Sequence, residues 1–343
     1  MTNDKDITIY DIAKKLKISP ATVSRGLADH PAISKKTKKK IFDFANEIGY
    51  RSNHFARNLR NQKTDTIGVI VPRLNSAFMS SVIAGVEQVA SEQGYTLIIS
   101  QSSESSAKEA VNAKTMFNSR VDGLLVSLAY DTKNLQHFDH FFKKATPVIF
   151  FDRVMDHRSC TTILIDNRKA AYDATKHLIE QGCKRIVHIT AQSDQNVYAD
   201  RLKGYKQALA EYKIKFREED VLYNNLSQEA GAEAAEHLLK MKPFPDGVFA
   251  ANDSCAVGCM LALKQKGICI PKDVAFVGFN NDPVAKVIEP NLSTVEYSGT
   301  EMGQVAARQL INHLTGASSI DNTNTIILRC DLLIRESSLK KGR

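Results

Sequence analysis

The chain has 343 residues, of which 43% are hydrophobic and 24% charged, so it is long enough for two or three domains with buried cores. No uncharged apolar run approaches the roughly 18 residues that a membrane helix needs. The N-terminus lacks the basic segment followed by an apolar segment that is typical of a signal peptide. The six cysteines have no metal-ligand spacing, which favours buried thiols in a reducing cytoplasm over a metal site.

The positive charge is concentrated at the N-terminal end. Residues 1–63 contain 14 Lys and Arg against 6 Asp and Glu, whereas residues 64–343 contain 32 of each. Lys and Arg side chains neutralise DNA phosphates and supply most sequence-independent DNA affinity. A basic run such as Lys35–Lys40 is, taken alone, typical of a solvated helix face. Together with the motif described next, it favours phosphate contact.

Two short helices are predicted in this basic segment. Ile9–Leu16 carries apolar residues at i, i+3, i+4 and i+7, which indicates an amphipathic helix. Ser19 and Pro20 then have the order of an N-cap and a first-turn residue, and begin a second helix that ends near Leu27. Helices joined so closely form a helix-turn-helix, whose second helix enters a major groove. The sequence therefore predicts a DNA-binding protein.

A third helix is predicted from Lys35 to Ile48, with Ser34 as its N-cap and Gly49 after its end. Its apolar face would pack against the first two helices. The helical run His54–Arg60 is too short to be stable alone, and residues 61–66 resemble a linker.

From Ile67 onward, short apolar strands alternate with amphipathic helices, which predicts parallel sheets covered on both faces. Two such series predict two Rossmann-like lobes with a cleft between them. The strands expected are Ile67–Pro72, Thr96–Ser100, Gly123–Ser127, Pro147–Asp152, Thr161–Asp166, Lys184–Thr190, Asp220–Asn225, Asp246–Asn252, Val274–Asn280, Leu292–Ser298 and Thr325–Arg335. The helices expected are Ala77–Gln93, Ala107–Ser119, Lys169–Gln181, Asp200–Tyr212, Gln228–Met241 and Ser254–Lys266.

A ligand of open α/β sheets binds beyond the carboxyl ends of the strands. The residues found there are mostly amides and carboxylates, which suit a neutral polyhydroxyl ligand because each hydroxyl both donates and accepts. They suit a phosphate or a fatty chain poorly. The chain has no tryptophan to stack on a sugar, which leaves Phe78 and Leu226. The polar and apolar residues that follow strands are Asn75, Ser76, Phe78, Gln101, Leu128, Ala129, Asp152, Asp166, Gln192, Asn252, Asp253, Asn280 and Asn281.

Four segments, Ile9–Ala13, Ala21–Arg25, Ile48–Tyr50 and Asn53–Leu59, resemble the N-terminal signature of the LacI/GalR (lactose-repressor/galactose-repressor) family of transcriptional regulators. The resemblance continues to about Ser337. It implies an all-α helix-turn-helix headpiece, followed by an α/β core of two Rossmann-like lobes that is similar to periplasmic binding proteins.

The resemblance also implies the domain boundaries. We expect a DNA-binding domain over residues 1–52, a hinge helix and linker over 53–64, a core over 65–337 and a tail over 338–343. Within the core we expect an N-lobe of about 65–164 and 295–324 and a C-lobe of about 165–294 and 325–337, joined by three crossings of the chain. The tail is too short for a tetramerising coiled coil, so a homodimer is expected.

In that family, a dimer places two recognition helices in successive major grooves, and a hinge-helix leucine wedges into the minor groove. Arg25 would bond a guanine, although a phosphate contact is the alternative. Leu59 would be the wedge, although a core leucine is the alternative. The resemblance assigns base-edge contacts to Pro20, Ala21 and Arg25, phosphate contacts to Tyr10, Thr22, Ser24, Tyr50 and Asn53, and further hinge contacts to Ala56 and Leu59.

The resemblance identifies Arg201 as the effector-binding arginine, and pairing with Asp152 alone is the alternative. Asn252 would contact effector or serve only as a helix N-cap. Asn280 stands where many members carry an aspartate, so the usual effector preference does not transfer. The complete set expected to bind effector is Phe78, Met79, Asp152, Arg201, Leu226, Asn252 and Asn280.

The sequence therefore predicts a cytoplasmic, nucleoid-associated regulator, a repressor by family default, that binds a DNA operator under control of a sugar-like effector. A nucleoside or purine, or a protein co-effector, is the alternative to the sugar. A solute-binding protein would carry a signal peptide and lack residues 1–60. An enzyme is disfavoured because G-x-G-x-x-G, G-x-x-x-x-G-K-[ST], H-E-x-x-H and G-x-S-x-G motifs are absent, so no catalytic residue or cofactor is expected.

Overall fold

The computed structural model describes residues 7–50, 63–155, 157, 160–191, 196–320 and 325–340. The chain divides into two compact units, Met1–Thr64 and Asp65–Arg343. Three residues predicted to contact DNA, Asn53, Ala56 and Leu59, lie outside the described residues. Within those ranges, no helix combines the length and the apolar composition that a membrane span requires.

The first unit contains the three predicted helices. Thr8 caps the first helix in a capping box with Asp11, and the helix ends at Lys17 in a left-handed conformation. The hydroxyls of Ser19 and Ser34 accept hydrogen bonds from backbone N–H groups at the starts of the next two helices. The helices are α1 (Ile9–Leu16), α2 (Pro20–Leu27) and α3 (Lys35–Glu47).

A small apolar core holds these helices together. Ile12, Val23 and Ile41 are fully buried, one from each helix. Gly26 lies where α2 crosses α3, and a Cβ at this position would collide with the end of the Ile41 side chain. Because so few residues form this core, its close packing fixes how α2 is presented.

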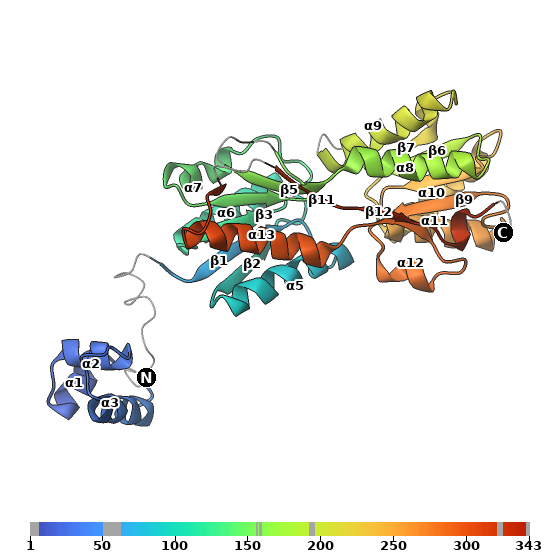
Figure 1. Cartoon of the computed structure of the whole chain (residues 1–343). Helices are drawn as coiled ribbons and strands as arrows, with labels where there is room; N and C mark the ends of the chain where they lie inside the picture. The colour runs from blue at the N-terminus through green and yellow to red at the C-terminus, as the bar shows by residue number, and fades with distance from the viewer. Residues whose placement is uncertain are drawn as a thin grey trace. The chain divides into compact units, whose positions relative to one another are not determined.

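The second unit begins with a six-stranded parallel sheet, which with its helices we call the N-lobe (Figure 1). Its strand order is β11-β5-β4-β3-β1-β2. The strands are β1 (Thr66–Val71), β2 (Thr96–Gln101), β3 (Gly123–Val126), β4 (Val148–Phe151), β5 (Thr161–Ile165) and β11 (Thr325–Leu328). The helices are α5 (Ala77–Glu92), α6 (Ser106–Asn118), η1 (Gln136–Phe138), α7 (Asp139–Lys143) and α13 (Gly299–Leu314).

A second six-stranded sheet forms the C-lobe, in the order β12-β10-β9-β8-β6-β7, with β12 antiparallel to β10. The strands are β6 (Ile186–Thr190), β7 (Val221–Tyr223), β8 (Gly247–Ala250), β9 (Ala275–Phe279), β10 (Ser293–Glu296) and β12 (Asp331–Leu333). The helices are α8 (Asn167–Glu180), α9 (Asn196–Glu211), η2 (Glu218–Asp220), α10 (Gln228–Lys240), α11 (Asp253–Gln265), α12 (Pro283–Val287) and η4 (Glu336–Ser338).

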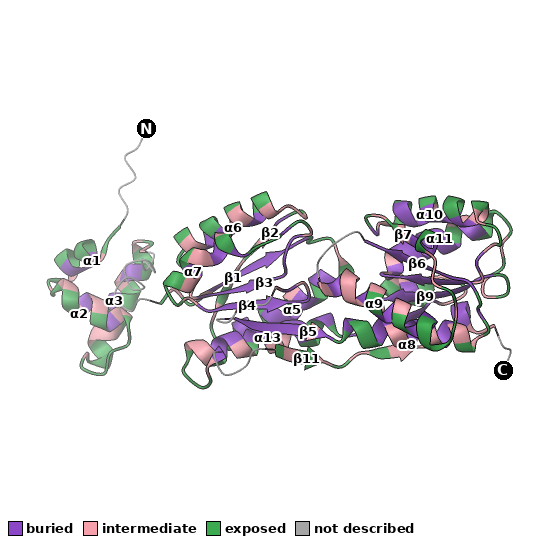
Figure 2. Ribbon diagram, turned by 90° about the horizontal axis from the view of Figure 1, so that it is seen from above, coloured by how far each residue is buried: buried purple, intermediate pink, exposed green. Residues whose placement is uncertain are grey.

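Helices cover both faces of each sheet, as predicted from the alternating pattern. α5 packs beside α13 on one face of the N-lobe sheet, and α6 packs on the other (Figure 1). In the C-lobe, α8 pairs with α9, and α10 pairs with α11. The central strands β1, β3, β4, β6, β8 and β9 are almost entirely buried (Figure 2). Apolar burial on both faces therefore stabilises the two sheets.

Glycine permits these helix pairs to approach closely. A Cβ at Gly85 on α5 or at Gly303 on α13 would collide with the backbone of the other helix. Gly231 on α10 and Gly258 on α11 occupy the same position in their pair, and so does Gly204 of α9 against α8. A backbone atom cannot move aside as a side-chain end does, so each crossing has one tight geometry.

The late strands differ from the sequence-based division into lobes. Residues 325–337 were expected in the C-lobe, but Thr325–Leu328 pairs with β5 in the N-lobe sheet, while β12 and η4 join the C-lobe. Ser293–Glu296 belongs wholly to the C-lobe sheet, so the N-lobe resumes after residue 296 and not at 295. The apolar run 325–335 is thus two short strands in different sheets. The chain crosses between lobes three times, after β5, after β10 and after β11.

Candidate functional site

The N-terminal end of α2 and the exposed face of α1 present the residues predicted to contact DNA. Ala21 and Arg25 are exposed on α2, and the side chain of Tyr10 on α1 is 68% exposed. Pro20 and Ser24 are half-buried. The apolar side of α2 faces the core, so its other side is available to a groove.

Local hydrogen bonds hold the start of this helix. The hydroxyls of Ser19 and Thr22 lie 2.8 Å apart, and Ser19 also accepts a hydrogen bond from the backbone N–H of Thr22. Tyr50, half-buried, packs against the core of the three helices. Each predicted residue among the described ones therefore lies at the surface or at its edge.

The basic run at the start of α3 has two roles. Lys38 donates to the carboxylate of Asp29 at 2.6 Å and to its carbonyl oxygen at 3.0 Å, so it fastens the preceding loop. Lys35, Lys36 and Lys39 are exposed on the same helix. We therefore expect the phosphate contacts of this run to come from Lys35, Lys36, Lys39 and Lys40 more than from Lys38.

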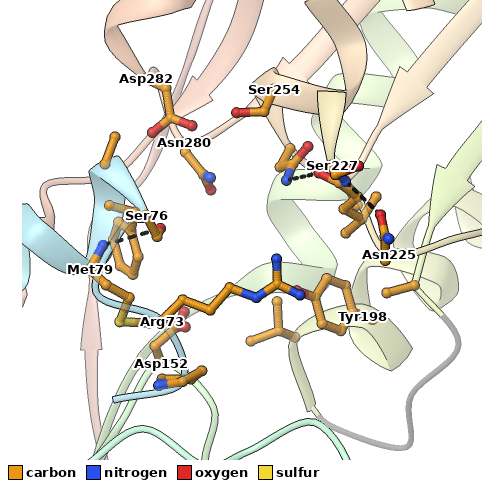
Figure 3. Close-up of a pocket in the computed structure, with 18 of the residues that line it drawn as sticks. Arg73, Ser76, Met79, Asp152, Tyr198, Asn225, Ser227, Ser254, Asn280 and Asp282 are labelled. Carbon is orange, nitrogen blue, oxygen red and sulfur yellow. Dashed lines mark hydrogen bonds between the residues drawn. The ribbon is translucent and has the colours of Figure 1, made fainter. Parts of the chain in front are cut away.

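A cavity of about 910 Å³ lies between the two lobes of the second unit (Figure 3). Its lining follows β1, β2, β3 and β4 of the N-lobe and β6, β7, β8, β9 and β10 of the C-lobe, which is where parallel sheets bind ligands. The volume lies near the upper end of the roughly 300–1,000 Å³ of small-molecule sites.

The structure brings together every residue predicted to bind effector. All seven line this cavity: Phe78, Met79, Asp152, Arg201, Leu226, Asn252 and Asn280. Asn75 and Ser76 also line it, as expected of residues that follow β1. Others that follow strands do not: Gln101, Leu128, Ala129, Asp166, Asp253 and Asn281 are outside the lining, and Gln192 lies outside the described residues.

Arg201 is the most buried charged side chain that faces the cavity, at 3% exposure. Its Nε donates to Asn167 Oδ1 at 2.9 Å and its Nη1 to the Ala251 carbonyl at 2.6 Å. The centre of its guanidinium lies 3.4 Å from the ring centroid of Phe279, in a cation–π arrangement. Neutral partners thus hold the arginine, and the simple pairing with Asp152 is not what positions it.

Asp152 is a buried carboxylate with a left-handed backbone, at φ 58°. Burial raises the pKa of its carboxyl, while the positive charges of Arg153 and Arg201 and a hydrogen bond with Tyr297 oppose the rise. The ring of Tyr297 lies 4.6 Å from that of Phe78, so an aromatic pair forms the wall beside the carboxylate.

The two predicted asparagines differ in how they are held. Asn252 caps α11, because its Oδ1 accepts from the Cys255 N–H at 2.8 Å and its Nδ2 donates to the Leu226 carbonyl at 2.9 Å. Its capping role is therefore realised, and it lines the cavity as well. Asn280, at φ 108°, accepts a weak hydrogen bond of 3.4 Å from the Tyr297 hydroxyl.

Sequence reasoning missed a charged cluster at the N-lobe side of the cavity. Glu104, after β2, is 2.6 Å from Arg153 and 3.3 Å from Arg73. Arg153 also donates to the hydroxyl of Tyr198 on α9, and its guanidinium lies 5.5 Å from that ring. Arg73 and Arg153 directly follow strands, so the rule that found Asp152 was also available for them.

The comparisons with known proteins agree with this geometry. Residues 64–336 match the periplasmic binding proteins and sugar binding domain of the LacI family, and residues 8–53 match the bacterial regulatory proteins of the lacI family. The transcriptional regulator RegA of Clostridium saccharobutylicum is 33% identical over 334 residues, which are 97% of this chain and 99% of that protein.

Two further similarities extend over most of the chain. Catabolite control protein A of Priestia megaterium is 30% identical over 310 residues, 90% of this chain and 93% of that protein. The structure of a transcriptional regulator CelR–cellobiose complex has a TM-score of 0.73 and 26% identity, and covers 96% of this chain and 99% of that one. RegA and CelR are both named as transcriptional regulators. The chain belongs to the LacI family of bacterial regulatory proteins, whose members are DNA-binding transcription regulators with a helix-turn-helix headpiece and a two-lobed, periplasmic-binding-protein-like core.

Proposed function

We propose that this chain is a repressor that binds a palindromic operator as a homodimer, and that a small sugar-like effector between its lobes controls its DNA affinity. One observation carries the proposal: a single chain combines an exposed recognition helix with a cavity lined by both lobes of a sugar-binding-type core. A CelR regulator of similar fold is known in complex with cellobiose, which supports a sugar-like ligand.

On the operator, the exposed side of α2 would read the major groove. Arg25 can bond a guanine bidentately, which is worth roughly 1–3 kcal/mol of discrimination between bases. Ala21 offers only a methyl group, so base reading at its position is weak. Pro20 would lie beside it at the base edges, while Tyr10, Thr22, Ser24 and Tyr50 would contact phosphates, as would Asn53, with Ala56 and Leu59 in the hinge.

In the cavity, an effector would touch both lobes at once. Phe78, Met79 and Asp152 belong to the N-lobe, whereas Arg201, Leu226, Asn252 and Asn280 belong to the C-lobe. A ligand with contacts on both sides favours one relative arrangement of the lobes over others. DNA and effector affinities are then reciprocally coupled, by typically about 1–3 kcal/mol. A regulator acting this way works in the cytoplasm, on the chromosome.

Two steps test the proposal. The full-length protein is used to select duplexes from a random pool, and the expected product is a palindrome whose half-sites are spaced for two recognition helices. Arg25→Ala should lose preference at one base position of each half-site, while Arg308→Ala, an exposed arginine on α13, should not. No enrichment of any palindrome at moderate salt would contradict operator binding.

The second step measures affinity for the selected operator in the presence of neutral sugars, acidic sugars, sugar phosphates and nucleosides. A sugar-class compound that shifts the operator Kd supports the proposal. A shift by nucleosides alone would replace the sugar by a base-containing effector. No shift with any compound would contradict small-molecule control and leave a protein co-effector.

A further inference from the structure

The charged residues that line the cavity are three arginines, Arg73, Arg153 and Arg201, and three carboxylates. At the N-lobe side, two guanidiniums, those of Arg73 and Arg153, share the single carboxylate of Glu104. Asp152, which directly precedes Arg153 at the end of β4, also lines the N-lobe side, while Arg201 and Asp282 line the C-lobe side. Among the described residues, Arg73 therefore shares its ion-pair partner, Glu104, with Arg153.

The two guanidiniums differ in how far their donors are used. Arg153 is 11% exposed in its side chain, and bonds Glu104 through one terminal nitrogen and the Tyr198 hydroxyl through the other. Arg73 is 46% exposed in its side chain, and its Nε lies 3.3 Å from Glu104 Oε1. Among the described residues, its guanidinium donates no hydrogen bond. Arg73 thus presents an unused fork of donors to the cavity.

The Tyr198 hydroxyl is a further hydrogen-bond donor on the wall of this cavity. The Tyr198 hydroxyl accepts a hydrogen bond from Arg153, so its own proton is available to another acceptor. Figure 3 shows Arg73 and Tyr198 on the wall of the same cavity as Asp152 and Asn280. A planar fork of N–H groups beside an O–H group is the donor set that carboxylates and phosphates bind.

We infer that the effector is an acidic sugar, whose carboxylate or phosphate is bound by Arg73 and Tyr198 while its hydroxyls face Asp152, Arg201 and Asn280. This inference rests on the proposed effector control of the regulator. An acidic ligand differs from the neutral ligand expected from the sequence. That expectation rested on the amides and carboxylates that follow the strands, and not on the arginines of the N-lobe. The size of the cavity accommodates a ring together with such a substituent.

Isothermal titration of the full-length protein with matched compounds tests this inference. The sets are glucose, glucuronate and glucose 6-phosphate, and galactose, galacturonate and galactose 6-phosphate, with inorganic phosphate alone as a further probe. We expect an acidic member to bind at least about tenfold more tightly than its neutral partner, as a charge-assisted hydrogen bond to a desolvated anion requires. The carboxylate and phosphate arms distinguish the two sources of negative charge.

Variants assign the difference to the residues named. Arg73→Gln should remove the preference for the acidic member and leave the affinity for the neutral one, whereas Arg73→Lys should retain part of it as a point charge. Arg308→Gln is the matched control, because Arg308 is exposed and does not line the cavity. Tyr198→Phe, which removes only the hydroxyl, should reduce the preference independently of Arg73.

The outcomes separate this inference from the function on which it rests. Equal or tighter binding of a neutral member, or an acidic preference that survives Arg73→Gln, would overturn the inference while effector control stands. Binding of inorganic phosphate as tight as that of a sugar phosphate would overturn the role of the sugar hydroxyls. A panel without any ligand would overturn both this inference and small-molecule control, while the operator selection still tests DNA binding.

Discussion

The Nη2 atom of Arg153 lies 3.1 Å from the hydroxyl oxygen of Tyr198, and this hydrogen bond joins the two lobes beside the cavity. Asn196, in the same first turn of α9, makes two more links: its Nδ2 donates to the Asp152 carbonyl at 3.1 Å, and its Oδ1 accepts from the Val154 N–H at 3.0 Å. The helix that carries Arg201 is therefore fastened to the N-lobe by its start.

Replacement of Asn196 by alanine should weaken the coupling between effector and operator. Both backbone links disappear, so a ligand held by Arg201 no longer pulls directly on the N-lobe. We expect the ratio of operator Kd values with and without effector to fall by about fivefold or more, from the loss of two hydrogen bonds. Fluorescence anisotropy on labelled operator measures this ratio. Lys203→Ala, exposed on the same helix, is the control, and an unchanged ratio in Asn196→Ala would refute the link.

Replacement of Arg201 by methionine should abolish the response to effector and preserve DNA binding. The methionine keeps an apolar side chain but removes the guanidinium over Phe279 and its donors to Asn167 and Ala251. Operator affinity without effector should stay within about twofold of the parent, since α2 lies in a separate unit. Titration calorimetry and anisotropy give the two readouts. A parent-like effector affinity would remove Arg201 from the site, and Arg168→Met, exposed on α8, is the matched control.

Gly26→Ala should destabilise the helix-turn-helix domain by about 1–3 kcal/mol, because the added methyl meets the side chain of Ile41 in a fully buried core. Ile41→Val should relieve this collision, because it removes the terminal methyl group of Ile41 that the methyl added at position 26 would meet. Ile41→Val alone costs about 0.5–1.5 kcal/mol. The double variant should therefore lose less stability than the sum of the single ones. Thermal unfolding of residues 1–64, followed by circular dichroism, gives the cycle, and strict additivity would contradict the packing described.

His188 should make the core labile to acid. Burial lowers the pKa of its imidazole to about 4; a hydrogen bond with the Phe249 carbonyl opposes this, and Arg201 adds to it. The folded state thus binds the proton more weakly than the unfolded chain, whose pKa is near 6.5. Its contribution to stability is complete above pH 6.5 and is lost as the pH falls from 6.5 through 4, by about 3 kcal/mol.

Urea unfolding at pH 7.5 and at pH 4.5 measures the effect of His188. His188→Phe should reduce the difference in stability between the two pH values, although it lowers stability at both through the lost hydrogen bond to the Phe249 carbonyl. His237→Phe, at an exposed position of α10, should keep the parent pH dependence. If His188→Phe lost as much stability as the parent between pH 7.5 and pH 4.5, the acid lability would belong to other groups.

Much of the backbone was predictable from the sequence because burial on both faces leaves a clear pattern. The strand expected at Ile67–Pro72 is β1, shifted by one residue. α13 lies outside the elements predicted, and Gly299 and Gly303 in its first turns explain this, since glycine is a weak helix former. The run 325–335 showed apolar character without showing which sheet each part would join.

The cavity, too, was only partly predictable from the sequence. Asp152 and Asn280 were predictable because each ends a strand, and the ends of parallel strands converge. The same rule was open to Arg73 and Arg153, but their pairing with Glu104 was not predictable: Arg153 is 49 residues from Glu104 and 45 from Tyr198. Local propensity carries no information about such pairs, so the ion pairs of the site were accessible only from the fold.

The glycine crossings of the helix pairs have a mechanical consequence. Gly85 and Gly303 in the N-lobe, and Gly231 and Gly258 in the C-lobe, each lie against the backbone of the neighbouring helix. Sliding one helix along the other would therefore bring main-chain atoms into collision. Each lobe should then turn as a stiff block, and the flexing is left to the three short tethers that follow β5, β10 and β11. A tilt of a few degrees at those tethers would become a displacement of several ångströms at the far rim of a lobe, a lever that needs no rearrangement inside it.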